Sequence, residues 1–570
     1  MASFPSQGPD FNADDKKSAF DKEVEEQAIA EGHDADIPTN RGAVSSAEEH
    51  PAHAPNRKID PPKSAVSKEI DTTTDIEKGA TAYSSETEEA ANGTADHAKV
   101  DGEPDDENIV WWDGDDDPAN PMNWSTKRKW NNIFILSGIT LVTPLASSIF
   151  APAVPQVMAD FHNSSTTLAT FVVSVYLLGF TFGPLVIAPL SELYGRLPLY
   201  HVNNALFIVF TVACAVSSNL NMLIGFRFLA GLVGSTPLTI GGGTLADLMP
   251  QEKRGGAMAL WGLGPLLGPI IGPVAGGYLA EAKGWRWVFW LLVMLSGVFD
   301  LLCLVYCRET YAPVLLQRKT ERLRKETGNL RLRSKLDTGL TPGDLFMRSI
   351  IRPTKLLCFM PICTVLCLYT AVVYGILYLL FTTFTYVFEE QYHFSSGNVG
   401  LTYLGIGIGL LVGLGAFGFA SDRILKAKTK NGGEMKPEYR LPPLVPGSFC
   451  IPLGLFLYGW TAQYHEQWAI PLLGTLFVGI GMLAVFMAIQ TYLIDAFTLH
   501  AASAIAANTV LRSVLGACFP LFGLDMYAAL GLGWGNSLLG FLSLAMCPIP
   551  FFLLKYGEKI RKHPKLQVKL

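Results

Sequence analysis

Five ionisable residues lie inside, or at the ends of, otherwise apolar stretches: Arg227, Asp247, Asp300, Asp495 and Arg512. Charges within a bilayer are costly and often mark proton or ion pathways. We interpret Arg227 as a buried cation that couples a carboxylate's proton to transport, or as an interfacial arginine that extends toward the surface. Asp247 and Asp300 are candidate proton carriers; the alternatives are a helix-end charge for Asp247 and a polar pair between helices for Asp300. Asp495 and Arg512 flank an expected loop and are interpreted as gate or topology residues.

Two acid–base pairs stand where the second apolar stretch of each half of the chain ends. They are Glu192 with Arg196, and Asp422 with Arg423. A small residue lies four positions before the acid in both places, which indicates an internal repeat. A carboxylate at a helix end can bind a helix N-terminus or an arginine of a neighbouring loop. We predict that these residues form latches that hold one mouth of the protein shut; the alternative is that they only set topology.

A third group of residues is suited to binding an organic molecule. Tyr374, Tyr378 and Phe381 fall on one helix face at i, i+4 and i+7. Such a face would take flat apolar or weakly cationic molecules by stacking and cation–π contact, although ordinary helix packing explains it equally well. Gln490 and Asn508 are polar groups at depth that would touch substrate or bond between helices.

The element that would let such sites move is a glycine-rich stretch. Residues 256–280 carry no charge, and glycine and proline recur there at a period of four. The residues concerned are Gly264, Gly268, Pro269, Gly272, Pro273, Gly276 and Gly277. In water these residues make a poor helix, but in lipid the backbone must still bond to itself. The spacing therefore predicts a bent membrane helix with one face stripped for close packing.

The chain divides into unlike parts. It has 570 residues, of which 49% are hydrophobic and 16% charged, yet the first 126 residues hold 30 acidic and 10 basic side chains and no apolar run of spanning length. A segment of that composition cannot bury enough surface to fold. We predict a disordered acidic cytoplasmic tail, an N-terminal six-helix bundle, a basic linker, a C-terminal six-helix bundle and a short C-terminal tail, over residues 1–126, 127–307, 308–355, 356–556 and 557–570.

Twelve apolar stretches are long enough to cross a bilayer. We place them at residues 131–155, 168–190, 198–217, 221–247, 256–280, 286–307, 357–388, 399–420, 442–463, 468–494, 502–524 and 535–555. Basic residues concentrate in alternate loops, which predicts that both termini are cytoplasmic. Asn163, in Asn163-Ser-Ser, would then be an outward candidate for glycosylation.

Several motifs together resemble the major facilitator superfamily, and within it the twelve-span drug:proton antiporters of the fungal multidrug and toxin efflux type. Residues 188–196 are similar to the superfamily's loop signature, with Ala188 for glycine and Glu192 for aspartate. Residues 227–231 resemble its fourth-helix basic motif, and residues 268–277 its fifth-helix antiporter motif. Glu309-Thr-Tyr replaces the Pro-Glu-Ser-Pro signature of sugar porters, which argues against a sugar.

The resemblance implies an all-α membrane protein of the major facilitator fold, with two pseudo-symmetric six-helix bundles and twelve transmembrane helices. It also implies a plasma-membrane monomer that exports a small hydrophobic organic compound, such as a drug, a fungicide or a self-made toxin, by proton antiport. The first span, 131–155, contains no acid, so the proton carrier is not obvious. The alternatives are an importer or facilitator of a small nutrient, and a membrane sensor that moves nothing. We expect no enzyme activity, cofactor, metal or nucleic-acid partner, since the phosphate-binding and metal-ligand patterns are missing from the sequence.

Overall fold

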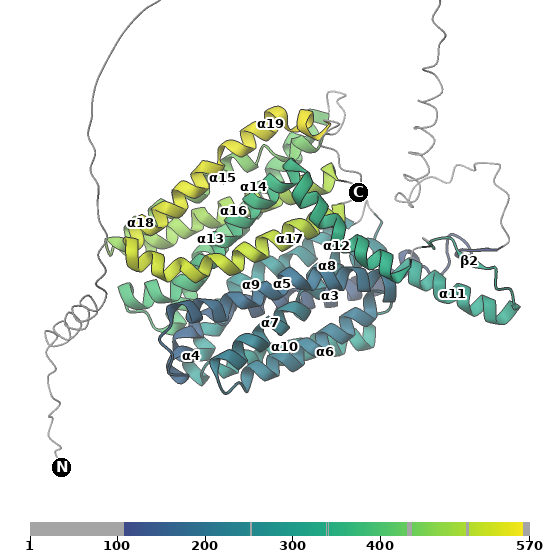
Figure 1. The fold of residues 1–570 in the computed structure, drawn as a ribbon, viewed down its shortest axis with the longest axis horizontal. Helices are drawn as coiled ribbons and strands as arrows, with labels where there is room; N and C mark the ends of the chain where they lie inside the picture. Colours follow the sequence, from purple (N-terminus) through teal and green to yellow (C-terminus); the bar gives the residue numbers. More distant parts are fainter. Residues whose placement is uncertain are drawn as a thin grey trace, which may run out of the picture. The chain divides into compact units, whose positions relative to one another are not determined.

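The computed structural model describes residues 108–250, 254–337, 339, 341–429, 436–497 and 501–562. The predicted acidic tail up to residue 107, the end of the predicted C-terminal tail and the side chain of Asp422 lie outside the described residues. The described residues are built almost entirely from helices, drawn in Figure 1.

The first half of the chain makes six passes. The first pass is α3, continued by η2 and α4, and the fourth is α7 joined to α8. The helices are α3 (Thr126–Ser148), η2 (Ala151–Ala153), α4 (Val154–Asp160), α5 (Thr166–Tyr194), α6 (Arg196–Ala215), α7 (Leu220–Gly234), α8 (Thr236–Leu248), α9 (Arg254–Lys283) and α10 (Arg286–Tyr306).

The second half repeats this layout. Its helices are α13 (Pro361–Tyr392), α14 (Ser396–Thr429), η4 (Pro437–Arg440), α15 (Leu444–Gln463), α16 (Ala469–Ala496), α17 (Ala501–Cys518), η6 (Phe519–Phe522), α18 (Gly523–Met546) and α19 (Pro548–Arg561). Eleven described stretches are long and apolar enough to span a membrane, and the last of them runs for 59 residues. At about 1.5 Å per residue this stretch is far too long for one pass. The backbone leaves the helical region at Gly531, with φ of 71°, so the stretch folds into two passes. The prediction of twelve transmembrane helices is therefore confirmed.

The linker between the halves contains α11 (Ala312–Thr327), β2 (Arg333–Ser334) and α12 (Pro342–Phe359). In Figure 1, α11 extends away from the stacked helices, whereas α12 lies against them and contacts α5, α13 and α17. Because α5 belongs to the first half and α13 and α17 to the second, α12 bridges the two halves.

The described residues begin at 108, inside the segment 1–126 that we expected to be disordered. β1 (Ile109–Val110) pairs in parallel with β2, with Ile109 opposite Arg333. The Lys319 ammonium then lies 2.6 Å from the Asp113 carboxylate and 3.7 Å from that of Asp117. Backbone N–H groups, together with Lys319, hold the pKa of Asp117 below its usual range. The described end of the acidic segment thus contacts the basic linker, which composition alone did not reveal.

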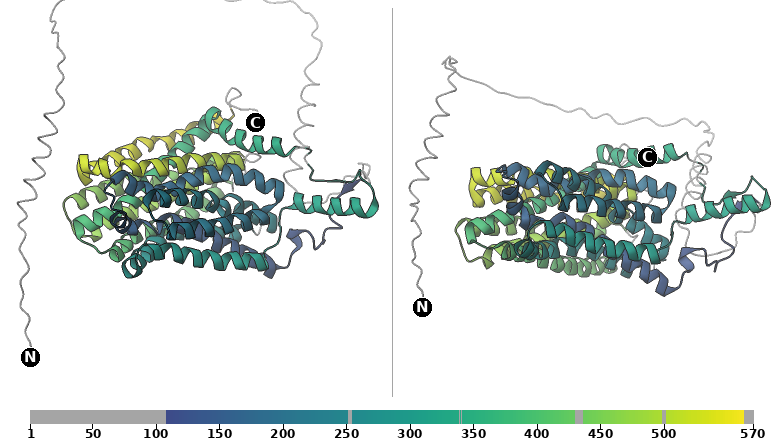
Figure 2. Two further views of the ribbon diagram at one scale, coloured as in Figure 1. Left: turned by 60° about the horizontal axis from the view of Figure 1, so that its bottom comes forward. Right: turned by 90° about the horizontal axis from the view of Figure 1, so that it is seen from below.

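The two halves form two bundles that meet along two helix pairs. Within the first bundle α3 packs on α9 and α5 on α7, and within the second α15 packs on α16 and α14 on α16. Between the bundles, α9 packs on α14 and α5 on α17. We call the side of the helix stack where α3 begins the linker end; α10 also finishes there. The opposite side, where α4 finishes and α5 begins, is the far end. Figure 2 shows α11 at the linker end.

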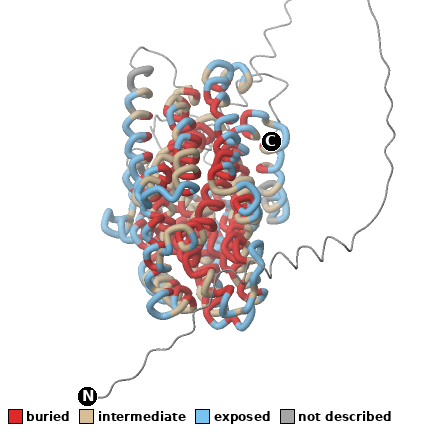
Figure 3. Tube along the Cα trace, turned by 90° about the vertical axis from the view of Figure 1, so that its left-hand side faces the viewer, coloured by how far each residue is buried: buried red, intermediate tan, exposed pale blue. Residues whose placement is uncertain are grey.

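Burial distinguishes inner from outer helices. Figure 3 shows buried residues along the middle of the helix stack and exposed ones along its periphery. The spanning window of α13 is 72% buried, whereas that of α10 is 33% buried although its mean hydropathy is higher, 2.4 against 2.1. An apolar yet exposed helix faces lipid. α13 therefore lies between other helices, where a solute site would be, and α10 lies outside.

The glycine stripe of α9 packs against α3 as its spacing predicted. A Cβ at Gly264 would lie 2.9 Å from the backbone nitrogen of Leu141, and one at Gly268 would lie 2.7 Å from that of Leu145. The next two glycines, Gly272 and Gly276, meet Ser148 and Ile149 in the same way. Gly277 faces the other way and meets Ser396 at the start of α14. The predicted close packing thus holds α9 to its own bundle over four turns, and to the other bundle at the far end.

We predict opposite outcomes for two alanine substitutions within α9. Gly268→Ala forces the α3 backbone to shift and should destabilise the protein by about 1–3 kcal/mol. Gly262→Ala is the matched control, because a Cβ there meets nothing within 4 Å and alanine favours the helix. Thermal unfolding in detergent measures both, and equal melting temperatures for the two variants would contradict the packing.

Candidate functional site

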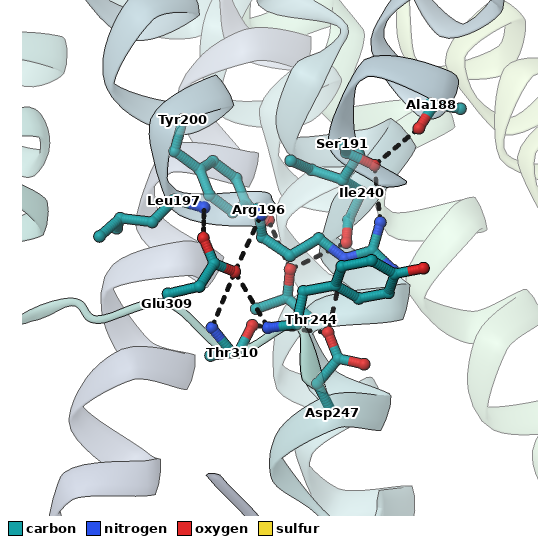
Figure 4. A network of polar contacts seen from close by, with 11 residues as sticks. Ala188, Ser191, Arg196, Leu197, Tyr200, Ile240, Thr244, Asp247, Glu309 and Thr310 are labelled. Carbon is teal, nitrogen blue, oxygen red and sulfur yellow. Dashed lines mark hydrogen bonds and ion pairs between the residues drawn. The ribbon is translucent and has the colours of Figure 1, made fainter. Parts of the chain in front are cut away.

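A polar network ties helix ends together at the linker end of the first bundle (Figure 4). Arg196, the first residue of α6, donates from Nη1 to Ser191 Oγ at 2.6 Å and from Nε to Asp247 Oδ2 at 3.4 Å. Its guanidinium also lies 4.4 Å from the ring centroid of Tyr311. Burial raises the pKa of Tyr311 to about 12, so this ring stays neutral. Arg196 therefore connects α5, α6 and α8 within one bundle.

The carboxylate of Glu309 closes the same network from the other side. Its oxygens accept hydrogen bonds from the backbone N–H groups of Arg196 at 3.0 Å and Leu197 at 3.1 Å, which begin α6. An anion at a helix N-terminus is stabilised by the unpaired N–H groups there. Gly195 precedes them with φ of 96°, and a Cβ at this position would collide with the Glu309 carboxylate. The sequence motif around Glu309 thus has a structural role that we did not assign to it.

The predicted latch residues of the first half have different surroundings. Arg196 is bound inside its own bundle, whereas Glu192 is exposed and forms no hydrogen bond or ion pair among the described residues. The structure brings Asp247 to Arg196, and Thr310 Oγ1 lies 3.5 Å from the same carboxylate oxygen. The Arg196 network is therefore an intrabundle clamp in this conformation.

The second bundle carries a matching clamp at the same end. Arg440 donates from Nε to Asp495 Oδ2 at 2.9 Å and from Nη1 to Ser421 Oγ at 3.4 Å. Ser421, Arg440 and Asp495 thus correspond to Ser191, Arg196 and Asp247. Sequence reasoning chose Arg423 instead, because it follows the repeat directly; the corresponding arginine lies further along, beyond residues 430–435.

Arg423 itself is exposed and lies 4.3 Å from the ring centroid of Phe419 on its own helix. A second carboxylate, Glu438, is buried and accepts from Arg561 Nε at 3.1 Å. It connects η4 to α19, the last helix of the bundle. The second half thus has two clamps at its linker end, as the first half does.

Two carboxylates connect the bundles at the far end. Glu281 Oε2, near the end of α9, accepts from the backbone N–H of Gly397 at 2.8 Å and from Ser395 Oγ at 3.2 Å, where α14 begins. Asp525 Oδ1, before the Gly531 break in α18, accepts from Thr166 Oγ1 at 3.0 Å, where α5 begins. Each bundle therefore supplies one acid that holds the start of a helix in the other bundle. Sequence reasoning missed both acids, because neither lies in a motif.

Arg227 is buried within the first bundle. It is 2% exposed, and its guanidinium lies 4.8 Å from the ring centroid of Phe150 and 5.5 Å from that of Tyr176. Its Nη2 donates to the Val173 carbonyl at 3.4 Å, and its Nε has no partner. Among the described residues no carboxylate pairs with it. The predicted cation is thus present at depth, but aromatic rings surround it in place of an acid.

Asp300 lies between the outer helices α6 and α10. Its Oδ1 is buried without a hydrogen-bond partner, and so are Nδ1 of His201 and Nδ2 of Asn204 on α6. Cys303 lies one turn further along α10 and is fully buried. This group of unpaired polar atoms is remote from the α13 face.

The three rings of the predicted aromatic face of α13 lie in contact, but their other neighbours differ. The rings of Tyr374 and Tyr378 lie 5.0 Å apart, and the Tyr378 hydroxyl is hydrogen-bonded to Ser147 Oγ of the other bundle at 2.9 Å. Phe381 is 1% exposed and packs on Tyr403 of α14, so it belongs to the interior of the second bundle.

Two polar candidates lie on helices that neighbour this face. Asn508 on α17 is 2% exposed, and its Oδ1 has no partner. Gln490 on α16 is half-buried. Arg512, which we expected beside a loop, lies well inside α17 and not at its end.

Comparison with known proteins gives a consistent picture. The family model described as "Major Facilitator Superfamily" matches residues 136–520. The chain is 57% identical to "Efflux pump radE" of Floropilus chiversii over 467 residues, which are 82% of this chain and 87% of that protein. It is 59% identical to "MFS-type transporter penM" of Penicillium rubens over 463 residues, 81% of this chain and 91% of that protein. A solved structure, the "partially occluded inward open conformation of the xylose transporter XylE from E. coli", matches with a TM-score of 0.55 at 16% identity, covering 76% of this chain and 98% of that one. The last likeness concerns the fold alone.

We predict that removing either far-end acid loosens the contact between the bundles. Glu281→Ala and Asp525→Ala each lose a contact worth about 1 kcal/mol, so amide hydrogen exchange around residues 166–170 and 395–400 should rise about fivefold. Glu390→Ala is the matched control, because Glu390 is an exposed acid in the last turn of α13, which also lies at the far end. Exchange that rises no more than in this control would contradict the assignment.

Proposed function

The chain belongs to the major facilitator superfamily, and from that premise we propose that it exports hydrophobic organic compounds by alternating access coupled to proton antiport. It is a multi-pass membrane transporter of small molecules. The observation that carries the proposal is the contact between the bundles, where two exposed carboxylates join them at the far end. Contacts of this kind can break without unfolding either bundle, as alternating access requires.

The direction of transport and the orientation are also proposals. The relative in Floropilus chiversii is named an efflux pump, and the glycine stripe of α9 resembles the antiporter motif of the superfamily. Basic residues gather at the linker end, for which the positive-inside rule favours the cytoplasm. We therefore place the linker end and both termini in the cytoplasm and the protein in the plasma membrane. Asn163, in the far-end loop after α4, would then be accessible to glycosylation.

We propose Asp300 with His201 as the proton site. Asp247 is already bound by Arg196, and Arg227 has no carboxylate partner among the described residues. Asp300 and His201 each have a buried polar atom without a partner, so a proton there would gain a hydrogen bond that the described structure does not make. Arg227 would act by keeping its charge close to Tyr378, which connects the two bundles.

Sealed proteoliposomes with an imposed pH gradient test this function. Radiolabelled hydrophobic fungicides and fungal metabolites should accumulate, and a proton ionophore should abolish the accumulation. Arg227→Ala should reduce the accumulation at least about tenfold, because it removes a buried cation that nothing else replaces. Asp300→Asn should abolish gradient-driven accumulation but leave substrate-for-substrate exchange, while Arg423→Ala, an exposed arginine, should behave as wild type.

The alternatives give distinct outcomes. Equilibration that does not depend on the gradient would identify a facilitator, and accumulation in the opposite sense would identify an importer. A ligand-induced fluorescence change without flux would identify a sensor. Each of these outcomes would overturn proton-driven export.

A further inference from the structure

Arg512 is an unpaired cation in the middle part of a membrane helix. It lies eleven residues inside α17 and is half-buried, and its Nε is buried without a hydrogen-bond partner. Its guanidinium lies 5.1 Å from the ring centroid of Tyr374 on α13 and 5.0 Å from that of Phe486 on α16. Among the described residues no carboxylate forms an ion pair with it. The guanidinium of an arginine carries a positive charge in proteins.

The surroundings of Arg512 combine aromatic and polar groups. Asn508, one turn earlier on α17, has a partnerless Oδ1 and faces the same side of the helix as Arg512. Gly516, one turn later, has no room for a Cβ between Tyr374 and Leu177 of α5, so the first bundle is in contact there. Arg512 thus lies one helical turn from the contact between the bundles, where a transported molecule must pass.

The clamp arginines are each paired with an acid, whereas Arg512, like Arg227, is not paired with one among the described residues. Arg196, Arg440 and Arg561 are each bound to a carboxylate at a helix end. The far-end acids Glu281 and Asp525 are likewise occupied with helix starts. No acid is therefore placed to neutralise Arg512 from within the described structure.

An unpaired charge in a low-dielectric site is costly, and an anion that enters the site offsets that cost. The same electrostatics repels a cation. The rings of Tyr374 and Phe486 would hold the flat body of such a molecule, and Asn508 Oδ1 can accept a hydrogen bond from a donor on that body. This differs from the flat apolar or weakly cationic molecules that the aromatic face alone led us to expect.

We propose, on the premise of the transport function above, that Arg512 binds the acidic group of the substrate. The exported compounds are then amphipathic aromatic acids: carboxylates, or enols and phenols acidic enough to ionise. Arg512 binds the anion, and the tyrosine and phenylalanine rings bind the apolar remainder.

The test uses the full chain in proteoliposomes with three matched probes: naphthoate, naphthamide and naphthylmethylammonium. Binding is measured by thermal stabilisation and by competition among the probes. Wild type should prefer naphthoate. Arg512→Gln should weaken naphthoate at least about tenfold and leave naphthamide unchanged, since it removes one partner of a charge pair. Arg512→Lys should keep part of the preference, and Arg423→Gln, an exposed arginine, all of it.

Several results would overturn the assignment. It fails if wild type binds naphthamide or naphthylmethylammonium as well as naphthoate, or if the preference for naphthoate survives Arg512→Gln. Should Arg512→Gln not fold, Tyr374→Leu replaces it: it should weaken naphthoate and naphthamide alike, and an unchanged affinity for both would remove the ring contact from the site. If naphthoate binds in a manner that depends on Arg512 but is not transported on any gradient, the binding site is supported and the export function is contradicted.

Discussion

The structure depends on how carboxylates meet the starts of helices. In a membrane the first N–H groups of a helix have no intrahelical partner and little water to bind, so an acid placed there is strongly favoured. Glu309 meets the start of α6 within the first bundle, where Gly195 leaves room for it. Across the bundles, Glu281 accepts from the Gly397 N–H at the start of α14, and Asp525 accepts from the Thr166 hydroxyl where α5 begins. Carboxylates at helix starts therefore serve two purposes: some hold one bundle together, and others join the two bundles.

Burial decides which of these contacts can open. Glu309 is buried and bonded to several backbone groups, so breaking its contacts would leave a charge stranded in the protein. Glu281 and Asp525 are exposed, so water can replace their partners at small cost. The glycine packing between α3 and α9 strengthens the distinction, because close backbone contact over four turns makes the first bundle move as one body. The bundles are thus rigid inside and separable at the far end.

The sequence predicted what depends on local pattern. The lengths of the apolar stretches were enough to predict twelve membrane passes. The period of four in the glycines was enough to identify the face of α9 that packs on α3. It failed where a partner is distant in the chain. Arg440 is 19 residues from Ser421, whereas its counterpart Arg196 is five from Ser191, so the spacing in the first half does not indicate the arginine of the second. Glu281 bonds to a residue 116 positions away, and no spacing rule indicates such a contact.

The two arginines at depth show how position changes the meaning of one residue type. Arg227 is sealed by Phe150, Tyr176 and Phe289, so only its field reaches the space between the bundles. Arg512 keeps exposed surface beside Tyr374, one turn from the contact with α5. A charge that is fully buried, such as that of Arg227, changes the energies of conformations that bring other charges near it. A charge that keeps exposed surface, such as that of Arg512, can also bind a molecule and so favour one class of substrate over another. The tyrosines of α13 connect the two, since Tyr374 lies under Arg512 and Tyr378 is bonded to the first bundle through Ser147. An anion bound at Arg512 would therefore act on the same helix face that joins the bundles, which gives the substrate a direct physical route to the movement that carries it.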